Sequence, residues 1–175
     1  MGFEQQLQIG QAGESAIARF LRARGNNVMP VYEKVIDTGK GPQVFTPSGS
    51  LVAPDLFVWS RKSVLWVEAK HKTAFTWHRK TGRWVTGIDL RHYGDYCQIA
   101  DTSPWPVWLM FLHRGGQAKD SPANSPAGLF GNELSKLRAQ ENHRHDNWGR
   151  SGMVYWAVGS LILISPMEEI YEVAA

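Results

Sequence analysis

The segment Pro54–Lys70, PDLFVWSRKSVLWVEAK, constrains the fold more than any other part of the chain. Two apolar runs flank a short basic turn, Arg61–Lys62, and this pattern predicts an antiparallel β-hairpin. With the turn centred there, Asp55 lies opposite Glu68, and directly paired residues share a face of the sheet with Cβ atoms about 4.5–5.5 Å apart. Lys70 returns to the same face two residues later. The sequence therefore places two carboxylates and a lysine together at one end of a hairpin.

Both faces of this hairpin are apolar, which is typical of strands in the middle of a sheet that helices cover on both sides. Charged groups in such surroundings are costly unless they are paired or bind a metal. Carboxylate oxygens are the ligands that Mg²⁺ and Mn²⁺ prefer, and a neighbouring lysine can orient a water or neutralise charge on a phosphate. The hairpin end is thus a predicted divalent-metal site, with Asp55 and Glu68 as ligands and Lys70 beside them.

The first predicted helix, Gln11–Arg24, carries an apolar stripe at helical spacing and is followed by a Gly-Asn stop. Glu14 lies on this stripe. Two interpretations of Glu14 remain open: a buried acid that completes the metal site, or an acid in the first turn that the helix dipole favours.

Strands and helices alternate downstream, which indicates an α/β fold. The buried strand Val107–Leu112 follows a helix that Asp89 can cap and that extends to about Asp101, so a parallel crossover is expected. The other predicted segments are the strands Asn27–Ile36, Gln43–Thr46, Met153–Val158 and Leu161–Ile164, a hairpin in Phe75–Gly87, a low-complexity stretch over Gly115–Gly128, a partly helical segment over Leu129–Gln140 and a short acidic helix after Ser165-Pro166.

Basic residues are concentrated around the hairpin: Arg61 to Arg91 holds eight Lys or Arg residues against two acids. Such a stretch favours a phosphate-backbone ligand. The predicted nucleic-acid contacts are Arg61, Lys62, Lys72, Trp77, Arg79, Lys80, Arg83 and Trp84. Two interpretations of the tryptophans stay open: they stack on bases, or they pack on each other in a surface hairpin.

Composition narrows the class of protein. With 43% apolar and 20% charged residues the chain is an ordinary globular protein, and no apolar run reaches the ~20 residues of a membrane span. A single cysteine and the absence of a secretory signal favour the cytoplasm. No GxSxG elbow and no phosphate-binding glycine loop occurs. A two-carboxylate glycosidase would suit Asp55 and Glu68, but Lys70 and the basic surroundings argue against it.

The residues Pro54-Asp55, twelve intervening positions and then Glu68-Ala69-Lys70 resemble the signature of the PD-(D/E)xK nuclease superfamily. The resemblance implies a restriction-endonuclease-like αβββαβ core with a central mixed sheet flanked by helices. We expect one domain over residues 1–175, with the core at about 11–113 and a C-terminal extension at about 114–175. The compact size and the early helical Glu14 are most similar to archaeal-type and phage Holliday junction resolvases.

The resemblance further implies a divalent-metal-dependent DNA endonuclease whose substrate is branched or duplex DNA. It implies that Asp55, Glu68 and Glu14 hold Mg²⁺ (or Mn²⁺) and that Lys70 is the catalytic lysine. Two symmetric cuts on a four-way junction imply a homodimer, and a phage-encoded enzyme of DNA recombination would act in the host cytoplasm. The alternatives are a nucleic-acid-binding module without turnover and an exonuclease or restriction-type nuclease of the same superfamily. All four residues together favour an enzyme.

Overall fold

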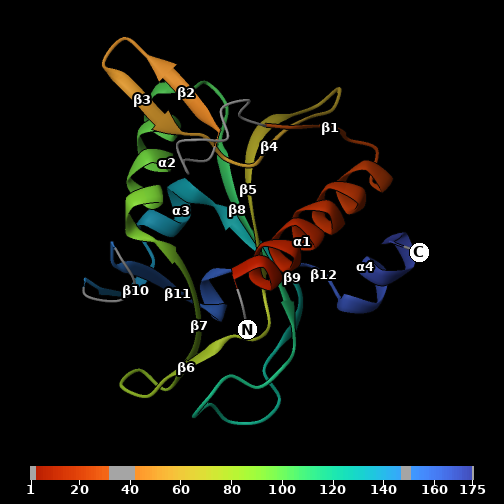
Figure 1. The fold of residues 1–175 in the computed structure, drawn as a ribbon, viewed down its shortest axis with the longest axis vertical. Helices are drawn as coiled ribbons and strands as arrows, with labels where there is room; N and C mark the ends of the chain where they lie inside the picture. Colours follow the sequence, from red (N-terminus) through yellow and green to blue (C-terminus); the bar gives the residue numbers. More distant parts are fainter. Residues whose placement is uncertain (1–2, 32–41, 147–150, 175) are drawn as a thin grey trace.

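A computed structural model describes residues 3–31, 42–146 and 151–174 (Figure 1). In chain order the elements are α1 (Phe3–Ala23), β1 (Asn27–Pro30), β2 (Gln43–Thr46), β3 (Gly49–Val52), β4 (Leu56–Trp59), β5 (Val64–Lys72), β6 (Thr76–His78), β7 (Arg83–Asp89), α2 (Leu90–Thr102), β8 (Val107–Arg114), β9 (Ala127–Glu133), α3 (Leu134–Arg138), β10 (Glu141–His145), β11 (Met153–Ala157), the 3-10 turn η2 (Val158–Ser160), β12 (Ile162–Ser165) and α4 (Met167–Ala174).

The central element is a six-stranded mixed sheet with the order β1-β4-β5-β8-β9-β12. Only β5 and β8 run parallel among its neighbouring strands, and α2 lies between them in the chain, as the predicted crossover requires. The expected αβββαβ core is confirmed as α1, β1, β4, β5, α2 and β8. Two hairpins, β2–β3 and β6–β7, interrupt it.

The predicted register of the β4–β5 hairpin is confirmed: Leu56 pairs with Val67. Its two-residue Arg-Lys turn lacks the glycine or asparagine that such turns favour. Serines on either side stabilise the turn instead. The Ser60 amide donates to the Ser63 carbonyl at 2.8 Å, and the Ser60 hydroxyl accepts a bond from the Lys62 amide at 3.2 Å. Side-chain capping of this kind replaces the usual turn chemistry.

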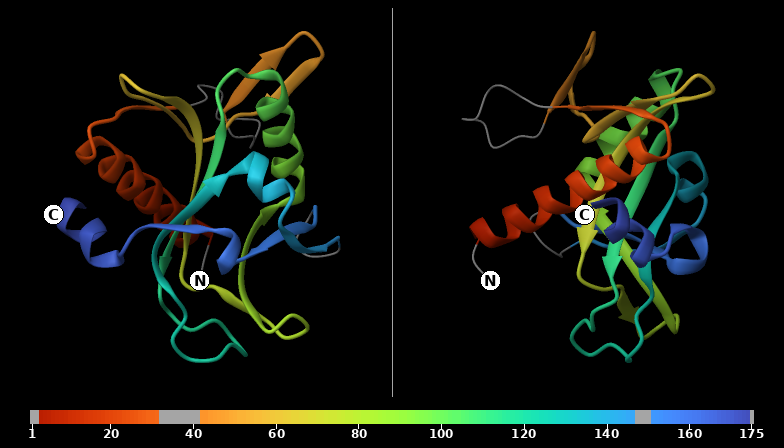
Figure 2. Two further views of the ribbon diagram at one scale, coloured as in Figure 1. Left: turned by 180° about the vertical axis from the view of Figure 1, so that it is seen from behind. Right: turned by 90° about the vertical axis from the view of Figure 1, so that its right-hand side faces the viewer.

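Two apolar cores lie on opposite faces of the six-stranded sheet. On one face, α1 and α4 pack side by side (Figures 1 and 2) and contribute Ile17, Phe20 and Ile170. On the other face, α2, α3 and a second sheet of order β10-β11-β7-β6 bury residues such as Trp156, whose indole N–H donates to the Leu137 carbonyl at 2.9 Å. Helices and the second sheet therefore already cover both faces of the six-stranded sheet, and the site residues lie between these packed layers.

The C-terminal residues complete the sheet rather than extend from it. β9 pairs with β8, β12 forms the far edge, and α4 packs on α1, where Arg24 and Glu169 form an ion pair at 2.5 Å. The region predicted as a C-terminal extension thus completes the central sheet and one of its cores.

Several boundaries differ from the prediction. The first helix begins at Phe3 instead of near Gln11, and the short predicted strand at residues 43–46 gains a partner, β3. β1 is an edge strand, as Pro30 indicated, and residues 32–36 of the predicted strand lie outside the described residues.

The low-complexity stretch packs against the second hairpin through serine side chains. Ser125 and Ser121 are both buried, and their hydroxyls accept hydrogen bonds from the Phe75 and Trp77 amides at 3.1 and 3.0 Å. These long-range contacts order a segment whose composition alone indicates a loop. In the parts of the chain that the structure describes, no helix has the length and apolar character of a membrane span.

Candidate active site

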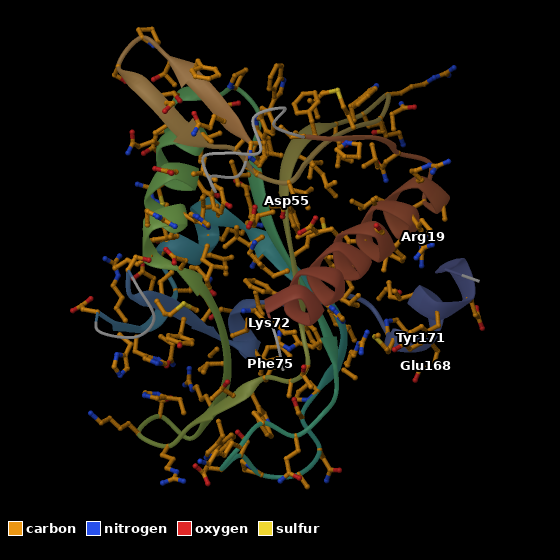
Figure 3. The ribbon with its side chains drawn as sticks, viewed as in Figure 1. Arg19, Asp55, Lys72, Phe75, Glu168 and Tyr171 are labelled. Carbon is orange, nitrogen blue, oxygen red and sulfur yellow. The ribbon has the colours of Figure 1, made fainter. Side chains whose placement is uncertain are left out.

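Asp55, Glu68 and Lys70 meet at the end of the β4–β5 hairpin, as predicted. The Asp55 Oδ2 accepts a hydrogen bond from the Ala69 amide at 2.9 Å, which holds the carboxyl beside β5. Glu68 is 1% exposed, and its side chain forms an ion pair with Lys70, which is about a third exposed (31%). Figure 3 labels Asp55 in the central part of the molecule. The alternation of β5 residues directs Glu68 and Lys70 toward the α2 side, because Val67 and Ala69 belong to the α1 core.

The electrostatics of this cluster follow from its burial. Burial and then repulsion from Glu68 raise the pKa of Asp55 to about 7. Burial alone would lower the pKa of Lys70, but the Glu68 and Asp55 carboxylates outweigh it and raise that pKa above its ordinary value. Lys70 is therefore a cation at neutral pH, and the carboxylate pair carries an unfavourable excess of buried negative charge that a metal ion would offset.

Glu14 joins the same cluster from α1. Burial and then the charge of Asp55 raise the pKa of Glu14, while Lys70 lowers it, so its carboxyl is close enough to interact with both. Because α1 begins at Phe3, Glu14 lies about three turns inside the helix, where the dipole of the helix end no longer acts. The first-turn interpretation of Glu14 is therefore wrong.

Tyr96 on α2 is a further residue of the site; the sequence alone left open whether it faces the site or lies at the rim or surface. It is 2% exposed on α2, and burial, followed by the Glu68 carboxylate, raises the pKa of its hydroxyl well above the ordinary value. The hydroxyl interacts directly with the Glu68 carboxylate, and this interaction contributes to its raised pKa. The sequence signal that could have indicated the burial of Tyr96 is its i, i+3 spacing from the buried Tyr93 on the same helix.

Replacement of Tyr96 by phenylalanine is expected to lower nuclease activity by about tenfold, the usual effect of losing a group that orients a metal-binding carboxylate. The Mg²⁺ concentration that gives half-maximal rate should rise in parallel. Tyr93→Phe is the matched control, because its hydroxyl bonds Glu141 at 2.5 Å on the same helix, outside the site. Equal rates for Tyr96→Phe and wild type would remove Tyr96 from the site.

The donor set fits Mg²⁺ or Mn²⁺. Both Glu68 oxygens are buried, the Lys70 ammonium lies beside Oε1, and the Asp55 Oδ2 accepts a hydrogen bond from the Ala69 amide, so both carboxylates keep lone pairs that could ligate a cation. The described side chains form no ready-made group of three His, Cys, Asp or Glu ligands. Mg²⁺ characteristically binds one or two carboxylates and completes its shell with water and phosphate. Asp55 and Glu68 suit this mode, and a direct ligand role for Glu14 stays a prediction.

The predicted DNA contacts fall into two groups. Lys72 lies on β5 two residues beyond Lys70, and burial together with the charge of Lys70 lowers its pKa to about 8. Arg79, Lys80 and Arg83 are exposed on the β6–β7 hairpin. In contrast, Arg61–Lys62 forms the turn at the opposite end of β5, about 20 Å from Glu68 at 3.3 Å per residue. Its contribution to DNA binding near the carboxylates stays a prediction.

Trp77 and Trp84 pair directly across the β6–β7 hairpin. Their ring centroids are 5.2 Å apart and the rings are inclined at 73°, an edge-to-face contact. The structure thus bears out the interpretation in which the two rings pack on each other. Stacking of either ring on a DNA base stays a prediction.

No protein-family model and no curated protein matches the sequence. The structure nevertheless defines a class of fold: the chain has the expected restriction-endonuclease-like arrangement, a central mixed sheet flanked by helices. It is similar to Hjc, a Holliday junction resolvase from the archaeal hyperthermophile Archaeoglobus fulgidus, with a TM-score of 0.51 and 9% identity over 86% of this chain and 90% of that chain. D212, a nuclease from a fusselovirus, aligns with a TM-score of 0.40 and 10% identity over 93% of this chain and 86% of that one.

Proposed function

We propose that this chain is a divalent-metal-dependent endonuclease that hydrolyses phosphodiester bonds in DNA and prefers branched substrates. The observation that carries the proposal is the fully buried Glu68 carboxylate, held between Asp55 and a charged Lys70. The fold shared with Hjc supports the choice of a nuclease, and the resolvase named there supports the choice of branched DNA.

Each residue has a separate task in this reaction. Asp55 and Glu68 would hold Mg²⁺ or Mn²⁺, which when bound lowers the pKa of a coordinated water and neutralises charge on the phosphate. Lys70 is protonated, so it donates hydrogen bonds to the phosphate oxygens or the attacking water and does not serve as a base. Glu14 accepts hydrogen bonds from water beside this group, and the Tyr96 hydroxyl orients the Glu68 carboxylate.

A panel of labelled DNAs tests the substrate preference: a four-way junction, a flap, a linear duplex and a single strand, each with Mg²⁺ and with EDTA. We expect Mg²⁺-dependent cleavage that is fastest on the four-way junction. A homodimer is tested separately, by mixing tagged and untagged chains and measuring whether they are recovered together. Faster release of nucleotides from linear ends than internal cutting would instead indicate an exonuclease. DNA binding with no cutting by wild type would favour the binding module.

Asp55→Asn is expected to stabilise the metal-free protein at neutral pH by about 1 kcal/mol, or about 2–4 °C in Tm. The amide oxygen can still accept the Ala69 N–H bond, whereas repulsion from the buried Glu68 is removed. At a hundred times its Kd, Mg²⁺ should raise the unfolding free energy of wild type by about 2.7 kcal/mol, and the Tm with it. The Tm of Asp55→Asn should not change when Mg²⁺ is added. Thermal scans with and without Mg²⁺ measure both effects, with the exposed Asp101→Asn as control. An equal Mg²⁺ shift in the Asp55 variant would contradict the assignment.

A further inference from the structure

The second sheet carries an aromatic stack that the catalytic group does not use. The ring of His78 on β6 lies 3.8 Å from that of His143 on β10 with an angle of 9°, and His143 lies 4.5 Å from Tyr155 with an angle of 5°. β6 and β10 are the two outer strands of the four-stranded sheet, so their contact shows that the sheet curls. Gly87 on β7 leaves room for the Tyr155 ring of this stack, because a Cβ there would lie 2.3 Å from the Val154 carbonyl oxygen and 2.7 Å from that ring.

A basic hollow of about 540 Å³ opens over this stack, and we call it the histidine hollow. Its lining combines two segments far apart in the sequence, the β6–β7 turn and β10. It also includes part of the low-complexity stretch, whose serines hydrogen-bond to the second hairpin. The lining residues are Trp77, His78, Arg79, Lys80, Lys119, Asp120, His143, Arg144 and His145. Four fixed cations thus face one acid in a space large enough for a phosphate group and its flanking sugars.

Three of the cations are available for a ligand. Arg144 is held by a bidentate bond to Glu141 at 2.7 and 2.9 Å, so much of its charge is already compensated. Among the described residues, no ion pair involves Arg79, Lys80 or Lys119. An anion is therefore the ligand that this lining favours.

The histidine rings point to the same chemistry. Burial, followed by the neighbouring His78, His145 and Lys80, lowers the pKa of His143, so positive charge is already crowded there. The Nδ1 of His143 hydrogen-bonds the Asn142 Oδ1 at 2.8 Å, which leaves Nε2 as the atom that gains or loses a proton. Because His143 is stacked between His78 and Tyr155, a phosphate suits this hollow better than a base that would need a free face of the His143 ring.

We propose that the histidine hollow binds a backbone phosphate of the DNA substrate, in an arm of the duplex away from the bond that is cut. This inference rests on the proposed function. His78 is eight residues from Lys70, and an extended chain spans at most about 3.6 Å per residue, so the two lie within about 29 Å. At 3.4 Å per step of one strand, the bound phosphate is at most about eight base pairs from the scissile bond. Lys72 lies between them on β5.

The test is DNA binding in EDTA, where no strand is cut, with a series of duplex arms from about four to about fourteen base pairs, so that the shortest arms end before the bound phosphate. Wild type should bind the long arm about three- to tenfold more tightly, and Lys80→Ala/Lys119→Ala should remove that gain. The double variant should also make the slope of log affinity against log salt shallower by about one to two. Arg22→Ala/Lys136→Ala, which removes two exposed cations from α1 and α3, is the matched control and should bind as wild type does.

His143→Gln separates the hollow from general surface charge, because glutamine keeps a polar side chain and cannot become a cation. It should lose part of the long-arm gain at low pH and little at high pH. Equal salt slopes for wild type and the lysine double variant would overturn the proposal, as would an equal loss on short and long arms. Competition by inorganic phosphate without any dependence on arm length would show a small-anion site instead. Because binding is measured without metal, a failure of this proposal can be distinguished from a failure of the proposed nuclease activity.

Discussion

Glu68→Gln is expected to lower the single-turnover rate of Mg²⁺-dependent cleavage by about a thousandfold or more. The substitution keeps the shape of the side chain but replaces one anionic oxygen by an NH₂ group, which donates hydrogen bonds and cannot ligate a cation. Glu68 is 1% exposed, its Oε1 forms an ion pair with Lys70, and the Asp55 carboxyl and the Tyr96 hydroxyl lie beside it.

The control for this variant is Glu172→Gln, which removes a carboxylate from the exposed face of α4. It should cleave at the wild-type rate. DNA binding in EDTA and the circular dichroism spectrum of Glu68→Gln should match wild type, so that the loss belongs to the chemical step. If Glu68→Gln kept more than about a tenth of the rate, the metal-ligand role of Glu68 would be wrong.

Lys70→Ala has the second-largest expected effect, a fall in kcat of about a hundred- to a thousandfold. The lysine is held as a cation by Glu68 and Asp55, and it is partly exposed at the point where a phosphate would meet them. Its loss removes the one fixed positive charge in contact with the carboxylates. The KM for DNA should change little, because the many cations of the β6–β7 region remain.

Rapid-quench kinetics on a fixed substrate separate kcat from KM, with Lys136→Ala on α3 as the control. Lys70→Arg should recover part of the rate, since it restores the charge in a bulkier form. A variant whose KM rises while kcat stays unchanged would assign Lys70 to substrate binding alone.

The site could be predicted because it depends on local rules. The turn position sets the register, and the register sets which residues share a face, so Asp55, Glu68 and Lys70 follow from numbering along one hairpin. The Arg-Lys turn was the weak step in that inference. The flanking serines, which the turn statistics do not include, stabilise it.

Other features depend on contacts between distant segments and have no local signature. Tyr96 lies beside Glu68 because α2 packs against the face of β5 that carries Glu68. The helical period alone does not say which buried position of the helix meets the carboxylate. The histidine hollow needs the curl of a sheet whose outer strands are more than sixty residues apart in the sequence. The role of the C-terminal strands was likewise open until the pairing of β9 with β8 and of β12 with β9 was known.

The central claim is that Asp55 and Glu68 hold a divalent cation that is required to cut DNA. Its most direct test is Mn²⁺ binding, observed by electron paramagnetic resonance, alongside Mn²⁺-dependent cleavage of the same four-way junction by wild type, Asp55→Asn and Glu68→Gln. The account predicts that wild type binds the ion and cuts the junction, and that both variants lose the two properties together. Cleavage by either variant at the wild-type rate, or cleavage by wild type in EDTA, would contradict it.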